Sequence, residues 1–347
     1  MIVDLHAHYP MHLLPPGQST HDALMSRRWK AHVRARIIDL ISRFANYQGP
    51  GGKPGVTVEL LNQGDVGVAL SVLYLPFAEI DLTKRYGAPP EPEYFEDLIG
   101  QLDLVESDIA THADDATVAR SLEELEAALR AGKLALVHCV EGGVQLGPLD
   151  VVEANVETLA RRGVVYVTLA HLFWRGVATN SPALPFMPDW LYNLVFHQPH
   201  GTGLTEIGRA ALTAMVRNKV MVDITHMSGR SIEDTFALLD ELDPDRRRPV
   251  MASHIACRFG HADYNVTDET IAKTAERDGV LGVIACEHWL TDGARKPKTF
   301  EESLDLICRH IDRIAEVTGS HDHAAIGSDM DGYIKPTVAG LEHAGHL

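Results

Sequence analysis

The stretch Leu134-Ala135-Leu136-Val137-His138-Cys139-Val140-Glu141 has the composition of a buried β-strand, with a largely apolar run that ends at a carboxylate. Seven other short runs are similarly apolar and rich in β-branched residues. They are Ile2–His8, Val66–Pro76, Val164–His171, Val220–His226, Pro249–His254, Val280–Cys286 and Ala324–Asp329. We expect one strand in each of these eight runs.

Amphipathic stretches separate the runs, and many of them begin with Ser, Thr or Asp, which are favoured residues at helix N-termini. The predicted helices are Ser121–Ala131, Leu149–Arg162, Thr205–Asn218, Ile232–Leu242, Thr267–Arg277 and Phe300–Thr318. Strands that alternate with helices form parallel sheets, because each helix carries the chain back to the start of the next strand. Eight such units predict an α/β protein with a (β/α)8 TIM-barrel fold.

The length of 347 residues fits one barrel with insertions, so we expect a single domain over residues 1–347. Two segments depart from the repeat, at about residues 9–64 and 173–203. The first contains a helical pattern near Trp29–Asn46 and the Gly- and Pro-rich Gln48–Gly55, and the second is rich in Pro and aromatic residues. We expect both to cover the barrel mouth, the second as a packing flap or as a substrate contact. After the eighth strand only Tyr333–Leu347 remains, which predicts a barrel without its last closing helix.

Composition and charge exclude several classes of protein. With 31 Lys and Arg against 48 Asp and Glu, the formal charge is −17, and the sequence has no basic stripe for nucleic acid. The chain has neither a signal peptide pattern nor an apolar run of the ~18 residues that a membrane span needs. Its four cysteines are scattered, without a metal-binding pair or a disulfide framework. We therefore expect a cytoplasmic enzyme that binds neither nucleic acid nor membrane.

Polar residues stand where many of the apolar runs stop. They are His6, His8, Glu141, His171, His226, His254 and Asp329. In a barrel of parallel strands, the C-terminal ends of all strands meet at one mouth, where the active sites of such enzymes lie. These residues therefore predict one shared site.

The residue types at this site favour a divalent metal. Strand alternation sends His6 and His8 to the same side, where two imidazoles can converge on one cation. Taken singly, each histidine could equally be a core residue bonded to a backbone carbonyl. Together with Glu141, His226 and His254 they form a ligand set suited to Zn²⁺, and Glu141 is the carboxylate able to span two ions.

The segment Ile326–Gly332 places Asp329 inward and Asp331 in a turn. Asp329 can hold and deprotonate a water bound to metal and then protonate a leaving amine, whereas Asp331 is expected to support the turn. The sequence has no Gly-x-Ser-x-Gly elbow, no phosphate-binding Gly-x-x-x-x-Gly-Lys and no dinucleotide-binding glycine motif after a strand. Metal-assisted hydrolysis is the chemistry that the residues favour.

Several strand ends resemble those of a known family. The segments VHCVEGG (137–143), VDITHMS (222–228), ASH (252–254) and GSDMDG (327–332) are similar to the renal (membrane) dipeptidases of the amidohydrolase superfamily, as are Gly203–Arg209 and Tyr166–His171. The resemblance extends in order from Asp4 to Gly332. It implies that one zinc ion is held by His6, His8 and Glu141 and a second by Glu141, His226 and His254. It also implies that Asp329 moves the proton and that His171 contacts the substrate.

The sequence departs from this family at two positions. His8 stands where the family usually has an aspartate, so the site loses one negative charge. Tyr264 stands where the family has an arginine that pairs with the carboxylate of a dipeptide. Arg258 lies nearby in the sequence and could substitute for that arginine. Arg258 and Tyr264 are therefore competing candidates for the substrate pocket.

Three hypotheses follow for the function. The first is a binuclear zinc dipeptidase in which a hydroxide bridging the two ions attacks the peptide carbonyl. The second keeps the ions but takes a lactam, N-acyl amine or other small amide or ester without a free carboxylate. The third is a non-catalytic barrel that retains metal for stability or binding. The partners expected are a dipeptide or other small-molecule substrate and, in a homodimer, a second copy of the chain.

Overall fold

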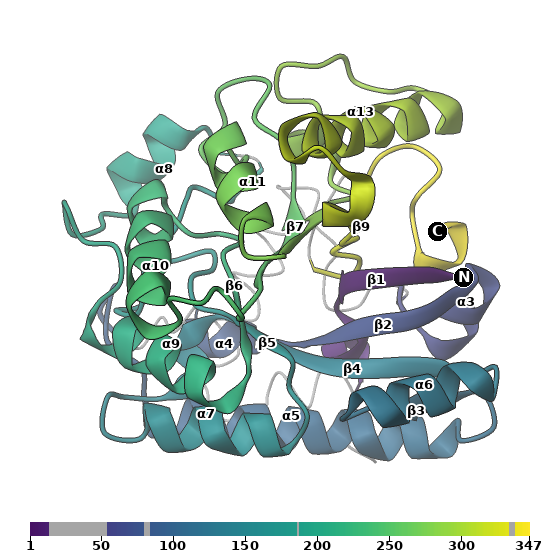
Figure 1. The fold of residues 1–347 in the computed structure, drawn as a ribbon, viewed down its shortest axis with the longest axis horizontal. Helices are drawn as coiled ribbons and strands as arrows, with labels where there is room; N and C mark the ends of the chain where they lie inside the picture. Colours follow the sequence, from purple (N-terminus) through teal and green to yellow (C-terminus); the bar gives the residue numbers. More distant parts are fainter. Residues whose placement is uncertain (14–53, 80–83, 186, 333–336) are drawn as a thin grey trace.

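The protein is a closed barrel of parallel strands surrounded by helices (Figure 1). The computed structural model describes residues 1–13, 54–79, 84–185, 187–332 and 337–347. Its strands lie in the order β2-β1-β9-β8-β7-β6-β5-β4-β3, and a further pairing between β2 and β4 closes the barrel over eight strands. The remaining strand, β3, pairs with the start of β4 beside the closed ring. The predicted TIM-barrel fold is confirmed.

All eight predicted runs contain a strand of the closed barrel. These eight strands are β1 (Ile2–Ala7), β2 (Val66–Leu73), β4 (Leu134–Glu141), β5 (Tyr166–Thr168), β6 (Met221–Asp223), β7 (Val250–Ile255), β8 (Val280–Val283) and β9 (Ala324–Ile326), and β3 (Ala116–Val118) lies outside the predicted runs. Three of them, β5, β6 and β9, end three residues before the polar residue that closes the predicted run. Those polar residues therefore lie in the loops that begin at the mouth.

The predicted helices are present with small differences at their ends. The α-helices are α3 (Val58–Gln63), α4 (Pro76–Glu79), α5 (Pro92–Thr111), α6 (Leu122–Arg130), α7 (Val152–Arg161), α8 (Asp189–Val195), α9 (Glu206–Asn218), α10 (Gly229–Leu242), α11 (Asp268–Ala275), α12 (Glu287–Leu290) and α13 (Phe300–Thr318). The side chains of Ser121, Thr205, Thr267 and Thr299 accept a hydrogen bond from the first turn of their helices. The N-cap signals in the sequence are thus confirmed.

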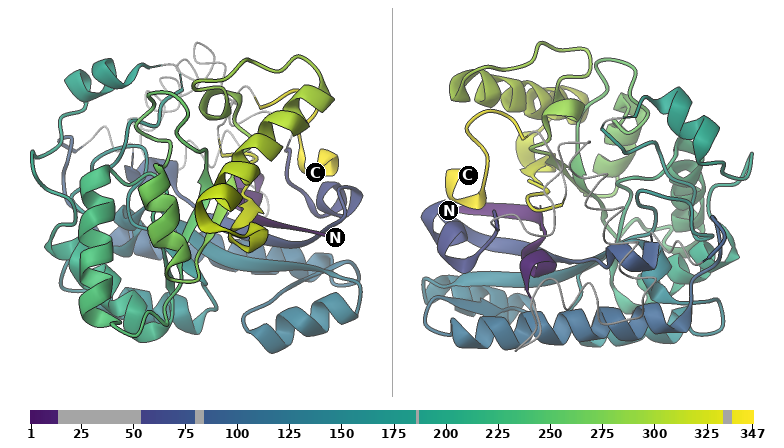
Figure 2. Two further views of the ribbon diagram at one scale, coloured as in Figure 1. Left: turned by 45° about the horizontal axis from the view of Figure 1, so that its top comes forward. Right: turned by 180° about the vertical axis from the view of Figure 1, so that it is seen from behind.

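Helix α5 and strand β3 lie between the second and third predicted strands and were not predicted. Helix α5 runs along one side of the barrel (Figure 2). It buries Tyr94, Leu98, Leu102, Val105 and Ile109, which are spaced three or four residues apart along one face. The helical period was therefore present in the sequence and could have been found. Strand β3 has three residues, too few to give a pattern.

The two predicted insertions are described in part. The helical pattern near Trp29–Asn46 and most of Gln48–Gly55 lie outside the described residues, while the second insertion carries α8. After β9, the described residues 337–347 contain a short 3-10 helix (Ala344–His346) and no α-helix. The backbone N–H of Ala344 donates to the carbonyl of Gly55 at 2.8 Å, which joins this end of the chain to the segment leading into α3.

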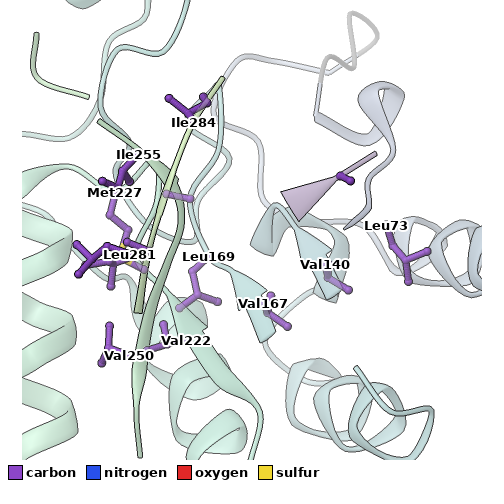
Figure 3. Close-up of a cluster of buried hydrophobic side chains, with 14 of the residues drawn as sticks. Leu73, Val140, Val167, Leu169, Val222, Met227, Val250, Ile255, Leu281 and Ile284 are labelled. Atoms are coloured by element: carbon purple, nitrogen blue, oxygen red, sulfur yellow. The ribbon is translucent and has the colours of Figure 1, made fainter. Parts of the chain in front are cut away.

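Buried apolar side chains line neighbouring strands of the barrel. Figure 3 shows Val167, Val222, Val250 and Leu281 on the successive strands β5 to β8. Each is less than 4% exposed, so this part of the sheet is a packed core. Among the described residues, no helix is long and apolar enough to cross a membrane.

Candidate functional site

The structure brings the seven polar residues at the strand ends together in one buried cluster. Glu141, the last residue of β4, lies at its centre and is 1% exposed. The Nε2 atoms of five histidines lie 3.3 to 3.4 Å from its carboxylate, with His6, His226 and His254 at Oε1 and with His8 and His171 at Oε2. One carboxylate is therefore shared by all five imidazoles.

The donor set fits divalent metal ions. The Nε2 atoms of His6 and His8 are 3.3 Å apart, those of His226 and His254 are 2.9 Å apart, and neither oxygen of Glu141 has a hydrogen-bond partner among the described residues. Donor atoms converge in three overlapping groups, which are His6–His8–Asp329, His6–Glu141–His254 and Glu141–His171–His226. Lone pairs on buried nitrogen and oxygen atoms are costly without a partner, and a divalent cation would be a common partner for these converging donors.

Burial and neighbouring charge set the protonation of these groups. Burial raises the pKa of Glu141, but the adjacent histidines, His171 first, lower it by more and hold the pKa well below its usual range. Burial, together with nearby His6, holds the pKa of His254 well below its usual range. Glu141 is thus a carboxylate and His254 a neutral imidazole, which are the forms that bind metal. Burial lowers the pKa of His8, but Asp329 and Glu141 raise it by more, to about 10, so His8 must lose a proton when it binds a cation.

Asp329 lies at the edge of the cluster, in the turn after β9. Its Oδ1 is 3.2 Å from Nε2 of His8, and its backbone N–H donates to the carbonyl of His6 at 2.8 Å. Asp331 points away from the cluster and accepts from the backbone N–H groups of Gly55 and Val56 at 2.8 and 2.9 Å. Asp331 therefore joins the turn after β9 to residues 55 and 56, whereas the sequence predicted only a supporting role within the turn.

His171 is held from behind by Glu79, a residue that the sequence analysis did not identify. Nδ1 of His171 is 2.6 Å from Oε2 of Glu79, which also accepts from the Tyr74 hydroxyl at 2.8 Å. The other oxygen, Oε1, accepts from the backbone N–H of Phe173 at 2.8 Å. Glu79 lies three residues beyond the predicted run Val66–Pro76, so spacing along that run gave no signal for its contact with His171.

Arg258 and Tyr264, the two candidates for substrate binding, differ in burial and in their hydrogen-bond partners. The Arg258 guanidinium donates to the backbone carbonyls of Asn265 and Asp263, each at 2.9 Å. Tyr264 is buried, and its hydroxyl donates to the carbonyl of His254 at 2.7 Å while its ring lies 5.1 Å from that of His226. Both residues line a cavity of about 210 Å³ that also reaches His226.

Two aspartates below the histidines were also missed as supporting residues. Asp4 accepts from the backbone N–H of His6 at 3.1 Å and from the hydroxyl of Ser328 at 2.5 Å. Asp223 accepts from the backbone N–H of Thr225 at 3.0 Å. Each aspartate stands two or three residues before a histidine of the cluster. An acidic residue inside an otherwise apolar strand was the signal in the sequence.

The chain is similar to known dipeptidases in sequence. It is 27% identical over 291 residues to dipeptidase verJ of Clonostachys rogersoniana, an alignment that covers 82% of this chain and 66% of that protein. It is also 27% identical over 286 residues to an uncharacterized dipeptidase of Schizosaccharomyces pombe, covering 81% of this chain and 62% of the relative. The chain thus spans slightly under two thirds of the length of these relatives.

Solved structures and a family model agree with this similarity. The probable dipeptidase PvdM of Pseudomonas aeruginosa has a TM-score of 0.63 at 19% identity, over 85% of this chain and 81% of that one. A metallo peptidase of Rhodobacter sphaeroides, bound to a phosphinate mimic of L-Ala-D-Ala, has a TM-score of 0.67 at 18% identity, over 100% of this chain and 90% of that one. These structural similarities establish the fold.

The sequence model of the membrane dipeptidase family matches residues 44–347. The chain therefore belongs to the membrane dipeptidase family, peptidase family M19.

Proposed function

We propose that this protein is a binuclear, metal-dependent dipeptidase. The observation that carries the proposal is the Glu141 carboxylate, which has histidines on both oxygens and no hydrogen bond of its own among the described residues. Such a carboxylate is suited to span two cations. Membership of the dipeptidase family supports the same activity.

In this proposal His6, His8 and Glu141 hold one ion, and Glu141, His226 and His254 hold the other. Zinc is the expected metal, because imidazole nitrogen and carboxylate oxygen are its common ligands. When bound, the ions would polarise the scissile carbonyl and lower the pKa of water toward ~7.

The side chains around the ions would do the remaining chemistry. Asp329, 3.2 Å from His8, would take a proton from the attacking water and return it to the leaving amine. His171 would stabilise the negative charge that develops on the carbonyl oxygen. Burial lowers the pKa of His171, but the charges of Glu141 and Glu79 raise it by more, and Glu79 would keep this effect when Glu141 binds the ions.

The substrate end of the site separates the main proposal from the second candidate. A dipeptide carries a terminal carboxylate, and two cationic residues, Arg258 and Lys273, line the cavity that reaches His226. The guanidinium already donates hydrogen bonds to two backbone carbonyls. This observation favours the second candidate, a lactam, N-acyl amine or other substrate without a carboxylate.

The cytoplasmic location, the homodimer and the single domain also remain predictions.

Two measurements test the proposal. Metal analysis of protein prepared without chelator should find two divalent ions per chain, and trace amounts would count heavily against it. A panel of L,L- and L,D-dipeptides should then be compared with lactams and N-acyl amino acids. Turnover of dipeptides alone supports the carboxylate contact if Arg258→Ala also raises the KM for dipeptides. The expected rise in KM corresponds to a loss of roughly 2–4 kcal/mol of binding free energy. Turnover of only the neutral substrates selects the second candidate.

A further inference from the structure

Ser253 lies beneath the histidine cluster, in β7, with no exposed surface. Its Oγ is 2.5 Å from Oδ2 of Asp223, 3.1 Å from Nδ1 of His6 and 2.9 Å from Nδ1 of His254. One hydroxyl thus contacts a carboxylate, two imidazoles and, at 3.4 Å, the hydroxyl of Thr225, whose own proton goes to Asp223. These imidazoles belong to the two different ion sites of the proposed function, on which this inference rests.

Counting protons fixes the direction of these hydrogen bonds. A serine hydroxyl has one proton and two lone pairs, whereas a carboxylate can only accept. Asp223 accepts on both oxygens, from the hydroxyl of Thr168 at 2.7 Å and from the backbone N–H of Ser253 at 3.0 Å. The Ser253 proton therefore points to Asp223. Both imidazoles must then donate Nδ1–H to Ser253, which leaves the lone pair of each on Nε2.

The two histidines depend on Ser253 to different degrees. Nδ1 of His6 has a second partner, the Tyr166 hydroxyl oxygen at 2.8 Å, and that hydroxyl donates to the carbonyl of Leu5 at 3.0 Å. Nδ1 of His254 contacts no acceptor besides Ser253 among the described residues. Loss of the Ser253 hydroxyl would leave His254 free to change tautomer or ring orientation, while Tyr166 still holds His6.

We propose that Ser253 is a positioning residue that fixes His6 and His254 with Nε2 free for metal, and that the ion bound by His254 depends on it more strongly. Residues behind metal ligands commonly change metal affinity by 10–100-fold. Ser253→Ala should therefore weaken one ion by at least about tenfold and leave the other within a few-fold of the unmodified protein.

The matched control is Ser71→Ala. Ser71 is also fully buried in a barrel strand, β2, and its hydroxyl has no hydrogen-bond partner among the described residues. The two variants remove the same atom from the same kind of environment. Only Ser253→Ala removes a contact with the histidines, so Ser71→Ala should leave both affinities unchanged.

The experiment is a titration of each metal-free protein with Zn²⁺ against a chromophoric chelator, which gives two dissociation constants without an activity assay. If the unmodified protein binds no zinc, the proposed function fails. If it binds two ions and Ser253→Ala binds both equally well, only the role of Ser253 is overturned. Equal weakening in Ser71→Ala would also overturn it, because the effect would then be one of packing.

A second variant covers the case in which Ser253→Ala does not fold. In Asp223→Asn the new amide would donate to Ser253, whose proton would turn toward an imidazole and drive the histidine proton onto Nε2. Nitrogen chemical shifts of the histidines, measured without metal, report this change directly. The expected result is an Nε2–H on His254 and a weakened second ion. An unchanged Nδ1–H tautomer in a folded Asp223→Asn protein would overturn the inference.

Discussion

At the residue scale, His226 and Asp329 have left-handed backbone conformations, with φ of 65° and 56°. Residues other than glycine seldom adopt this region, and when they do they often lie at functional sites. Asparagine and aspartate tolerate it best, because their short side chains can hydrogen-bond to the local backbone. Asp329 can therefore be changed to asparagine without disturbing the turn.

Asp329→Asn should remove turnover while leaving the metal content and the melting temperature close to those of the unmodified protein. The amide keeps the shape and the backbone conformation but cannot accept the proton of the attacking water. The decrease in kcat should be at least about 100-fold. Steady-state rates and metal analysis of the same preparation check it, and a variant that keeps its kcat would assign proton transfer to another group.

Glu79→Gln tests the carboxylate behind His171. The charges of Glu141 and Glu79 raise the pKa of His171, so the imidazolium form is lost only as pH rises through that raised value. Removing the Glu79 charge should move the alkaline limb of kcat/KM to lower pH. The pH profile measures this shift, and Glu123→Gln, on the exposed face of α6, is the control. Identical alkaline limbs in all three proteins would contradict the assigned role of His171.

At the element scale, β7, β8 and the turn after β9 approach closely at two glycines. A Cβ added at Gly327 or Gly282 would lie 1.7 or 2.0 Å from the carbonyl oxygen of Ser253. The Ser253 carbonyl is part of the backbone, so it cannot move away from an added Cβ as the end of a flexible side chain could. These glycines hold the β9 turn, and with it Asp329, against the strand that carries His254.

Gly327→Ala should therefore destabilise the protein by about 3 kcal/mol or more, or prevent folding. Gly100→Ala is the control, since Gly100 lies inside α5 with no atom within 4 Å of a Cβ added there. That change should stabilise by about 0.5–1 kcal/mol, because alanine favours helix. Urea unfolding measures both, and the prediction fails if the two variants unfold alike.

Long, periodic elements could be predicted from the sequence, and shorter ones could not. Helix α13 begins at Phe300 and ends at Thr318, as its pattern indicates. Strand β3 consists of Ala116–Val118, and a three-residue strand has no detectable alternation. Glu79 and Ser253 were missed for another reason. Their contacts depend on which side chains face each other after the barrel closes, and spacing along one strand does not contain this information.

At the scale of the whole molecule, the barrel topology explains why the site itself was predictable. Every strand presents its C-terminal end at one mouth, so the polar residues at these ends had to converge. Packing of the outer helices buries a histidine away from the site. His310 in α13 accepts from the backbone N–H of Cys257 at 3.0 Å, and burial lowers its pKa to about 4.

This buried histidine should make the fold sensitive to acid. The unfolded chain binds a proton at His310 near pH 6.5, whereas the folded chain does so only near pH 4, so stability falls as pH falls between these values. The slope contributed is at most about 1.4 kcal/mol per pH unit. Urea unfolding of His310→Gln at pH 7 and pH 5 should give lower stability at pH 7 and a shallower pH dependence. His321→Gln, at an exposed position in the 3-10 helix His321–His323, should change neither, and a slope unaffected by His310→Gln would refute the linkage.

The five imidazoles around Glu141 also have a consequence for metal selectivity. With His8 in place of a carboxylate, the cluster is richer in nitrogen and poorer in negative charge than an oxygen-rich centre. Nitrogen sites follow the Irving–Williams order, in which Cu²⁺ binds more tightly than Zn²⁺ and Mn²⁺ binds weakly. Affinity alone would fill such a cluster with copper wherever copper is free. Under the proposed function, the supply of zinc and copper in the compartment would therefore decide which ion is bound, and metal analysis of samples purified from different hosts should give different ions.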